Sequence, residues 1–170
     1  GLFKTINGGI SWTNVTAGIP NRYIMDIAID PDNENLVYAA IGGFGTPHLF
    51  RSINGGANWN ALGSGLPDVP VNTVTIDPLN TSIIYLGNDI GIYVSVDAGL
   101  TWQTFNDGLI DGTFVMDISI SESNRKLRLA THGKGVFERP MLPVTATSSE
   151  EIVTSMQMQI YPNPAKDFIN

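Results

Sequence analysis

Residues 95–102 read Ser95-Val-Asp-Ala-Gly-Leu-Thr-Trp102, and the same pattern occurs twice more in this chain of 170 residues. The other copies are Thr5-Ile-Asn-Gly-Gly-Ile-Ser-Trp12 and Ser52-Ile-Asn-Gly-Gly-Ala-Asn-Trp59. We call them boxes 1, 2 and 3 in chain order. Their tryptophans are separated by 47 and 43 residues. A fixed period of this length indicates a repeat architecture in which each copy is one structural unit.

The segments between the boxes repeat as well. Ile24-Met-Asp-Ile-Ala-Ile-Asp-Pro31 aligns with Val71-Asn-Thr-Val-Thr-Ile-Asp-Pro78 and with Val115-Met-Asp-Ile-Ser-Ile-Ser121. In the first of these, Met25, Ile27 and Ile29 alternate with smaller or acidic residues, which predicts a strand with one apolar face. Each unit contains three or four such runs, bounded by Gly, Pro, Asn and Asp turns.

A four-stranded antiparallel unit that repeats every 40 to 50 residues is typical of a β-propeller blade. We therefore predict an all-β chain with about three four-stranded blades, a fragment of a larger propeller. The predicted propeller part covers 1–140, with blade 1 at 1–20, blade 2 at 21–66, blade 3 at 67–109 and blade 4 at 110–139. Three blades are too few to close a ring, and the chain begins with Gly1 rather than Met. We expect earlier blades of a longer protein to complete the ring; closure by another copy of this chain is the alternative.

The boxes have a structural explanation. The third position holds Asn7, Asn54 or Asp97, whose side-chain oxygen can accept backbone N–H bonds from the following turn. The glycines at the fifth position permit positive φ angles, and the tryptophan offers a large apolar surface to a neighbouring strand. We predict a structural role for the following box residues: Asn7, Gly9, Trp12, Asn54, Gly56, Trp59, Asp97, Gly99 and Trp102.

The boxes resemble the Asp-box, or BNR repeat, whose pattern is Ser-x-Asp-x-Gly-x-Thr-Trp. Such repeats occur in sialidases, xyloglucanase-type glycoside hydrolases, sortilin-like receptors and photosystem-assembly propellers. The resemblance implies a propeller with each box between the third and fourth strands, away from the ligand face. Ala130-Thr-His-Gly-Lys-Gly-Val-Phe137 is similar to the last blades of the sortilin- and xyloglucanase-like branch. The arginine triad of sialidases has no counterpart.

Composition excludes several classes of protein. Sixteen acidic against nine basic residues give a net charge of −7, so we expect no nucleic-acid binding. The absence of cysteine excludes disulfide scaffolds, thiol catalysis and Cys-ligated metals. No apolar run approaches the roughly 20 residues of a membrane-spanning helix.

The C-terminal region predicts secretion. Residues 141–156 include a Ser/Thr-rich stretch that we interpret as a linker. Residues 157–170 resemble the truncated start of a type IX secretion C-terminal sorting domain, which implies a Bacteroidetes protein that is secreted or held at the outer cell surface. The secretion machinery would then be a partner. The resemblance rests on Tyr161, Pro162, Asn163, Pro164 and Asp167.

In a propeller, ligands bind on the face formed by the loops between second and third strands and between blades. The aromatic residues near these loops, Phe44, Tyr23 and Phe114, could stack on sugars or pack between blades. The candidate ligand-binding residues are Phe44, His48, Asn88, Asp89, His132 and Lys134.

Asp26 and Asp117 occupy equivalent places on first strands, where blade 3 has Thr73. Two carboxylates roughly 5–9.5 Å apart could cleave a glycosidic bond; equally, they could cap strands, bind channel water or join an ion site. No His pair has metal-ligand spacing, so zinc catalysis is not expected. The acidic turn 30–34 could hold calcium but lacks EF-hand spacing, and we expect no cofactor.

Two functions remain open from the sequence. The first is a secreted or surface module that binds a glycan, such as a polysaccharide, or a surface protein. The alternative is a glycoside hydrolase of the xyloglucanase type, whose catalytic residues lie largely outside this chain.

Overall fold

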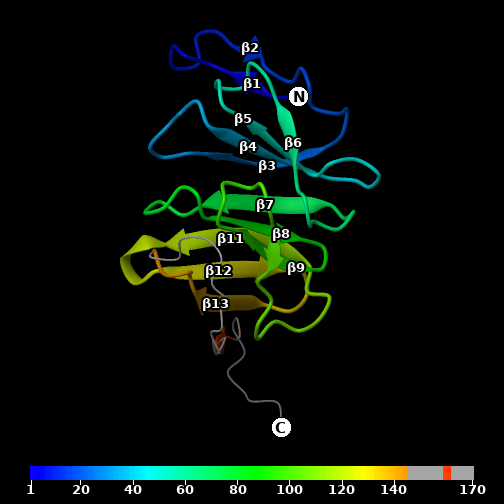
Figure 1. The fold of residues 1–170 in the computed structure, drawn as a ribbon, viewed down its shortest axis with the longest axis vertical. Coiled ribbons are helices and arrows are strands. Elements are labelled where there is room, and N and C mark those ends of the chain that lie inside the picture. Colours follow the sequence, from blue (N-terminus) through cyan, green and yellow to red (C-terminus); the bar gives the residue numbers. More distant parts are fainter. Residues whose placement is uncertain (145–158, 162–170) are drawn as a thin grey trace.

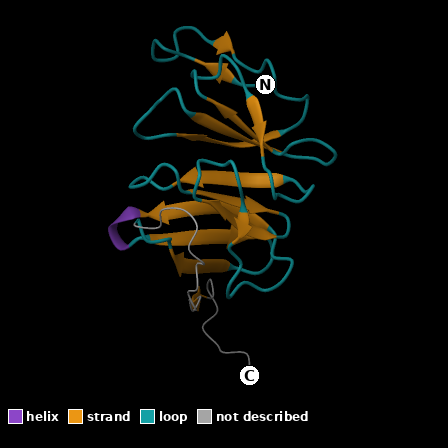
Figure 2. Cartoon of the chain, viewed as in Figure 1, coloured by secondary structure: helices purple, strands orange, loops and turns teal. Residues whose placement is uncertain are grey.

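The computed structural model describes residues 1–144 and the backbone of 159–161. The regular secondary structure of these parts consists of short strands joined by turns and loops, with a single turn of 3₁₀ helix at Glu122–Asn124 (Figure 2). The strands are β1 (Phe3–Lys4), β2 (Thr13–Asn14), β3 (Ile24–Ile29), β4 (Val37–Ile41), β5 (Leu49–Ser52), β6 (Asn60–Leu62), β7 (Val71–Ile76), β8 (Ile84–Asn88), β9 (Gly91–Ser95), β10 (Gln103–Thr104), β11 (Val115–Ser121), β12 (Lys126–Thr131), β13 (Val136–Pro140) and β14 (Gln159–Tyr161).

The strands form one two-stranded and three four-stranded antiparallel sheets, stacked along the long axis of the molecule (Figure 1). Within each sheet the strands follow in chain order, β1-β2, β3-β4-β5-β6, β7-β8-β9-β10 and β11-β12-β13-β14. The predicted all-β class is confirmed. Blade 1 contributes only β1 and β2, and blades 2 and 3 contribute complete sheets.

Blade 4 contributes β11, β12 and β13 from the predicted range 110–139. Its fourth strand is β14, in which Tyr161 pairs with Val136 and Ile160 with Phe137. The rest of the predicted linker and sorting segment lies outside the described residues, including Pro162, Asn163, Pro164 and Asp167. Their assignment therefore stays a prediction.

The first strands of the three four-stranded sheets share one irregularity. A β-bulge falls at Met25 in β3, at Asn72 in β7 and at Met116 in β11, one residue after each strand begins. The extra residue of a bulge shifts by one the alternation of side chains between the two faces of a strand. Since the bulge falls at the same position in all three first strands, the residues after it have the same register in all three sheets. Ile27, Val74 and Ile118 are equivalent, and they pair with Ala39 of β4, Leu86 of β8 and Leu129 of β12, respectively.

Apolar side chains fill the spaces between neighbouring sheets, as expected for stacked sheets that bury both faces. Between blades 2 and 3, Tyr38 and Leu49 pack against Val74, Leu86 and other residues of the next sheet. Between blades 3 and 4, a second cluster surrounds the fully buried residues Tyr85, Leu129 and Phe137. A smaller cluster between blades 1 and 2 contains Leu2, Phe50 and Trp59.

All three boxes close their turns with the same hydrogen bonds. In box 3 the Ser95 hydroxyl donates to Asp97 and accepts from the N–H groups of Asp97 and Gly99, while Asp97 accepts from the N–H of Thr101. Boxes 1 and 2 repeat this set around Thr5 and Ser52. Boxes 2 and 3 lie between the third and fourth strands of their sheets, the position that the resemblance implies, and box 1 lies between β1 and β2.

Box 3 differs from the others in carrying a charge. Partial burial acts to raise the pKa of Asp97, but hydrogen bonds from Thr101, Ser95 and Leu100 outweigh it and hold this pKa below its usual 3.8. A lowered pKa in the folded protein stabilises it above the unfolded-state pKa, and this contribution is lost as the pH falls through the folded-state value.

We expect Asp97→Asn to reduce the loss of stability below about pH 4, measured as the urea midpoint between pH 7 and pH 3. The variant should fold, because Asn7 already makes the equivalent bonds in box 1 and donates its amide to Ser11 at 2.9 Å. An identical pH profile for both proteins would contradict this role of Asp97.

No helix in the described part of the chain is long and apolar enough to cross a membrane.

Candidate functional site

The predicted binding residues lie at one end of the stacked sheets, which we call the loop end. It is formed by the connections β4–β5, β8–β9 and β12–β13, together with the connections from one sheet to the next. The box turns lie at the opposite end, because each follows a third strand that runs away from the loop end. The loop end brings together polar side chains from neighbouring blades at each junction.

At the first junction, His48 and Asp68 join blades 2 and 3. The His48 side chain is buried, and its Nε2 lies 2.8 Å from an oxygen of the largely exposed Asp68 carboxylate. Because a carboxylate only accepts, Nε2 carries the proton and donates it. The N–H of Gly45 donates to the same oxygen at 2.7 Å. These bonds, from Gly45 first and then His48, hold the pKa of Asp68 below its ordinary value.

An open cavity of about 350 Å³ lies beside this pair. Its walls come from the β4–β5 loop and the β6–β7 connection, with Thr46, His48 and Asp68 as polar groups and Leu62, Leu66 and two prolines as apolar ones. Phe44, at the tip of the β4–β5 loop, is 61% exposed. The N–H of Gly42 donates to the Tyr23 carbonyl, which holds this loop beside Tyr23, another exposed aromatic residue.

At the second junction, polar side chains tie blade 3 to blade 4. The Asn72 amide donates to Asp89 and to the Val115 carbonyl, both at 3.0 Å. Asn88 is fully buried, and its side-chain oxygen accepts the N–H of Ile90. Asn88 and Asp89, which the sequence suggested as ligand contacts, thus shape the β8–β9 turn and the blade junction.

At a third position of the loop end, the β12–β13 loop contacts the β10–β11 connection, which leads into blade 4. The His132 ring meets the edge of Phe114, with ring centroids 5.8 Å apart, and the His132 N–H donates to the Phe114 carbonyl. Lys134 donates to the Asp111 carbonyl at 3.0 Å and approaches the Thr113 hydroxyl. His132 remains exposed and Lys134 half-buried, so both side chains still face the loop end.

Asp26 and Asp117 occupy equivalent positions after the bulges of β3 and β11, as predicted. The Asp26 side chain forms hydrogen bonds with the next blade. One of its carboxylate oxygens accepts from the Thr73 hydroxyl at 3.0 Å and from the Val74 N–H at 2.9 Å. The other accepts the N–H of Ile27. Asp117 lies on the outermost described sheet and is exposed. Asp26 therefore fastens blade 2 to blade 3 in this structure, and its catalytic assignment stays a prediction.

Within residues 1–144, no three His, Asp or Glu side chains are grouped so that they could hold a metal ion. In the acidic turn 30–34, Asp30 instead accepts the N–H groups of Asp32 and Asn33. Sequence reasoning missed Asp68 as a site residue. Asp68 is an acidic residue in an inter-blade connection, and its partner His48 is 20 residues away along the chain.

Comparison with solved structures places this arrangement among known folds. An ancestral GH74 enzyme superimposes on 82% of this chain with a TM-score of 0.66 and 26% identity. The GH74 enzyme of Niastella koreensis covers 66% of the chain with a TM-score of 0.55 and 25% identity. The GH74 xyloglucanase of Xanthomonas campestris covers 74%, at 16% identity and a TM-score of 0.55. The fold is that of a β-propeller.

The chain spans only part of these proteins: 21%, 19% and 24% of the three structures, respectively. Neither a family model nor a curated protein matches the sequence. The likeness to GH74 chains thus establishes propeller blades and is consistent with a glycan-related module.

Proposed function

We propose that this chain is part of an Asp-box propeller that binds polysaccharide at its loop end. The observation that carries the proposal is the cavity at His48 and Asp68, whose wall includes Gly45, together with the exposed Phe44 that precedes Gly45 in the chain. The C–H face of a sugar ring packs on an aromatic side chain, while neighbouring polar groups bond its hydroxyls. The Asp68 carboxylate, already fixed by two donors, supplies further acceptor positions.

Xyloglucan is the first polysaccharide to test, because one structural neighbour is a xyloglucanase. We expect Phe44→Ala to weaken binding of xyloglucan oligosaccharides about tenfold, since a stacking aromatic contributes roughly 1.5 kcal/mol. Isothermal titration calorimetry on the purified chain measures this change. Ile53→Ala is the matched control, because Ile53 is equally exposed but lies in a box turn at the opposite end. Equal affinities of Phe44→Ala and the unchanged protein would refute glycan binding at this loop.

A second candidate function is glycoside hydrolysis by a longer protein that contains this chain. Two neighbours with 25–26% identity are GH74 enzymes, and both oxygens of Asp26 are occupied by structural bonds. The catalytic carboxylates would then lie outside this chain. Release of oligosaccharides by the full-length protein, unaffected by Asp117→Asn, supports this candidate; binding without cleavage supports a binding module.

We also propose that the protein reaches the outer cell surface or the medium through the type IX machinery. The support is the resemblance of 157–170 to a sorting domain, placed after a Ser/Thr-rich stretch. In a type IX-competent host, deletion of the segment from Tyr161 onward from the full-length protein should abolish its export, as measured by fractionation. Continued export of the shortened protein would refute this role.

A further inference from the structure

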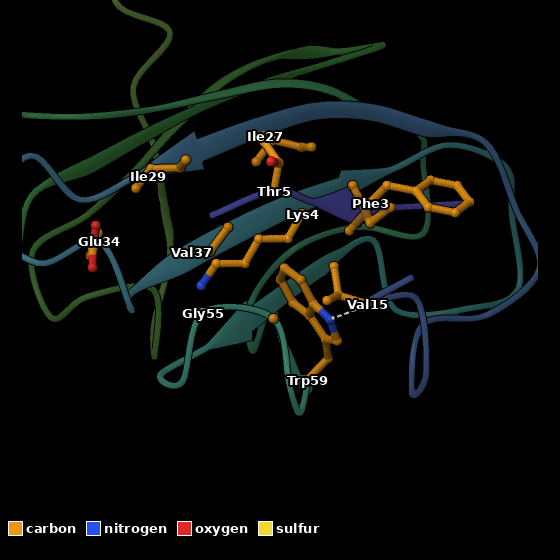
Figure 3. A pocket seen from close by; sticks show the side chains of 12 residues that line it. Phe3, Lys4, Thr5, Val15, Ile27, Ile29, Glu34, Val37, Gly55 and Trp59 are labelled. Atoms are coloured by element: carbon orange, nitrogen blue, oxygen red, sulfur yellow. Dashed lines mark hydrogen bonds between the residues drawn. The ribbon is translucent and has the colours of Figure 1, made fainter. Parts of the chain in front are cut away.

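The cavity at His48 and Asp68 has walls of a different kind from those of a cavity between the strands of blades 1 and 2. The latter, of about 330 Å³, is lined largely by strands, with β1 on one side and Ile27 and Val37 on the other (Figure 3). Pairing of β1 with β2 and of β3 with β4 fixes the backbone of these walls. At the loop end, apart from Leu62, the residues that line the cavity lie in connections between strands. Its shape therefore depends on the contacts that hold these connections in place.

The connection that carries Phe44 is rich in glycine. It reads Gly42-Gly43-Phe44-Gly45, and the φ angles of Gly43 and Gly45 are +97° and +73°. Glycine adopts such angles without strain, but it also has the most backbone freedom to lose when a loop becomes ordered. The position of the Phe44 ring is therefore set by how firmly the glycines on its two sides are held.

One hydrogen bond holds the loop on each side of Phe44. On the N-terminal side, the Gly42 N–H donates to the Tyr23 carbonyl at 2.8 Å. On the C-terminal side, the Gly45 N–H donates to a carboxylate oxygen of Asp68 at 2.7 Å. The first bond joins two segments of blade 2. The second reaches across to the β6–β7 connection, so the place of Phe44 depends on the Asp68 side chain.

Asp68 is in turn held by His48. The Asp68 side chain is 62% exposed, whereas that of His48 is 5% exposed, and His48 Nε2 donates to the oxygen that also accepts from Gly45. These bonds, that of Gly45 first, keep the pKa of Asp68 low, so its carboxylate is charged at neutral pH. Hydrogen bonds to a charged acceptor are stronger than those to a neutral one. A buried histidine thus fixes an exposed carboxylate, which fixes the loop.

We propose that Asp68 is a positioning residue that holds the Phe44 ring ready to stack on a sugar, through its bond to the Gly45 N–H. This inference rests on the proposed binding of polysaccharide at the loop end. A loop that is ordered before the ligand arrives loses less conformational entropy when the ligand binds. Asp68 therefore contributes to affinity through Phe44, in addition to the acceptor positions that its carboxylate offers.

The ligand-free chain tests the loop by itself. In the unchanged protein we expect ¹⁵N relaxation to give the Phe44 amide an order parameter of roughly 0.85, and Asp68→Ala should lower it below about 0.6. Asp68→Asn should preserve the order, because one amide oxygen can accept both N–H groups. Asp32→Ala is the matched control. It removes the same charge from the exposed β3–β4 turn at the opposite end of the sheets and should also preserve the order.

Gly45→Ala keeps the test valid if Asp68→Ala, which leaves the buried His48 without this partner, does not fold. An alanine Cβ at position 45 meets no atom within 4 Å, but the φ angle of +73° disfavours any residue with a side chain. The variant therefore loosens the loop while Asp68 and His48 remain paired. We expect it to lower the order parameter of the Phe44 amide as Asp68→Ala does.

A double-mutant cycle tests whether Asp68 acts on binding through Phe44. With xyloglucan oligosaccharides as the probe in calorimetry, Asp68→Ala should weaken binding about fivefold in the unchanged background. When Phe44 is already replaced by alanine, the same change should weaken binding about twofold or less, because the ring that Asp68 positions is gone. The control Asp32→Ala should leave the affinity unchanged.

Two results would overturn the proposal. The first is an order parameter of the Phe44 amide that stays near 0.85 in Asp68→Ala and in Gly45→Ala. The second is an additive cycle, in which Asp68→Ala costs the same affinity with and without Phe44, because Asp68 would then act only by direct contact with the sugar. The proposed function fails separately, when Phe44→Ala binds like the unchanged protein. In that case the ligand-free measurement still shows whether Asp68 positions the loop.

Discussion

Asp77→Ala is expected to lower the free energy of unfolding by about 3 kcal/mol, because it removes one partner of a buried ion pair. Asp77 is fully buried at the end of β7. Its two carboxylate oxygens accept from Nη1 and Nη2 of Arg125, at 2.6 and 2.5 Å. Arg125 comes from blade 4 and also donates to the Leu142 carbonyl. The pair therefore joins blade 3, blade 4 and the segment after β13, and its loss is measured as a shift of the urea midpoint.

Asp30 provides a control inside the same chain, since it occupies the equivalent turn of blade 2. Both aspartates accept N–H bonds from their own turn, Asp30 from Asp32 and Asn33, and Asp77 from Leu79. Asp77 additionally forms the ion pair with Arg125, whereas the bonds named for Asp30 come from its own turn. Asp30→Ala is thus expected to cost only about 1 kcal/mol, the usual cost of losing a turn or cap hydrogen bond. Equal losses for the two variants would show that the Arg125 pair contributes nothing beyond the turn.

Arg125→Ala and the double variant complete the test. If Asp77 and Arg125 act on each other, the double variant will be less destabilised than the two single losses added together. Additive losses would assign the effect of Asp77→Ala to its turn bonds and its burial instead.

The repeat made most of the fold predictable from sequence. The boxes fixed where third and fourth strands meet, and the apolar alternation of 24–29 and its copies fixed the first strands. What alignment of the repeats could not supply is contact between positions far apart in the chain. Asn72 stands where the other repeats have Met25 and Met116, and only the structure shows that its amide reaches the Val115 carbonyl of the next blade.

The sequence was enough to predict which loops carry the candidate site, but not which side chains in them contact one another. The period places Phe44, His48, His132 and Lys134 at one end of the sheets, because every second strand ends there. The pairing of His48 with Asp68 depends on the path of the β6–β7 connection, which brings together two residues 20 positions apart in the chain. The contact of Arg139 was equally hidden: this buried side chain of blade 4 donates to the Phe105 carbonyl and lies over the Phe105 ring, 3.3 Å from its centroid.

Trp102→Ala is expected to cost about 3–5 kcal/mol, the range for removing a large aromatic side chain from a packed core. Trp102 is 8% exposed and packs between blades 2 and 3, in the cluster that contains Tyr38 and Leu86. Its Nε1–H donates to the Gly99 carbonyl at 3.0 Å, so the ring also braces the turn of box 3. Trp12 is the matched control: it is the last residue of box 1, as Trp102 is of box 3, but it is 60% exposed.

Because Trp12 has lost little contact with water on folding, Trp12→Ala should change the stability of this chain by about 0.5 kcal/mol or less. Comparing the urea midpoints of Trp102→Ala and Trp12→Ala therefore separates the contribution that a box tryptophan makes by packing on the preceding blade from the contribution that it makes within its own turn. If the tryptophan acts mainly through packing on the preceding blade, the losses differ as stated. If it acts mainly within its own turn, Trp12→Ala will cost as much as Trp102→Ala, and the conclusion that the boxes stabilise the stack of blades would be wrong.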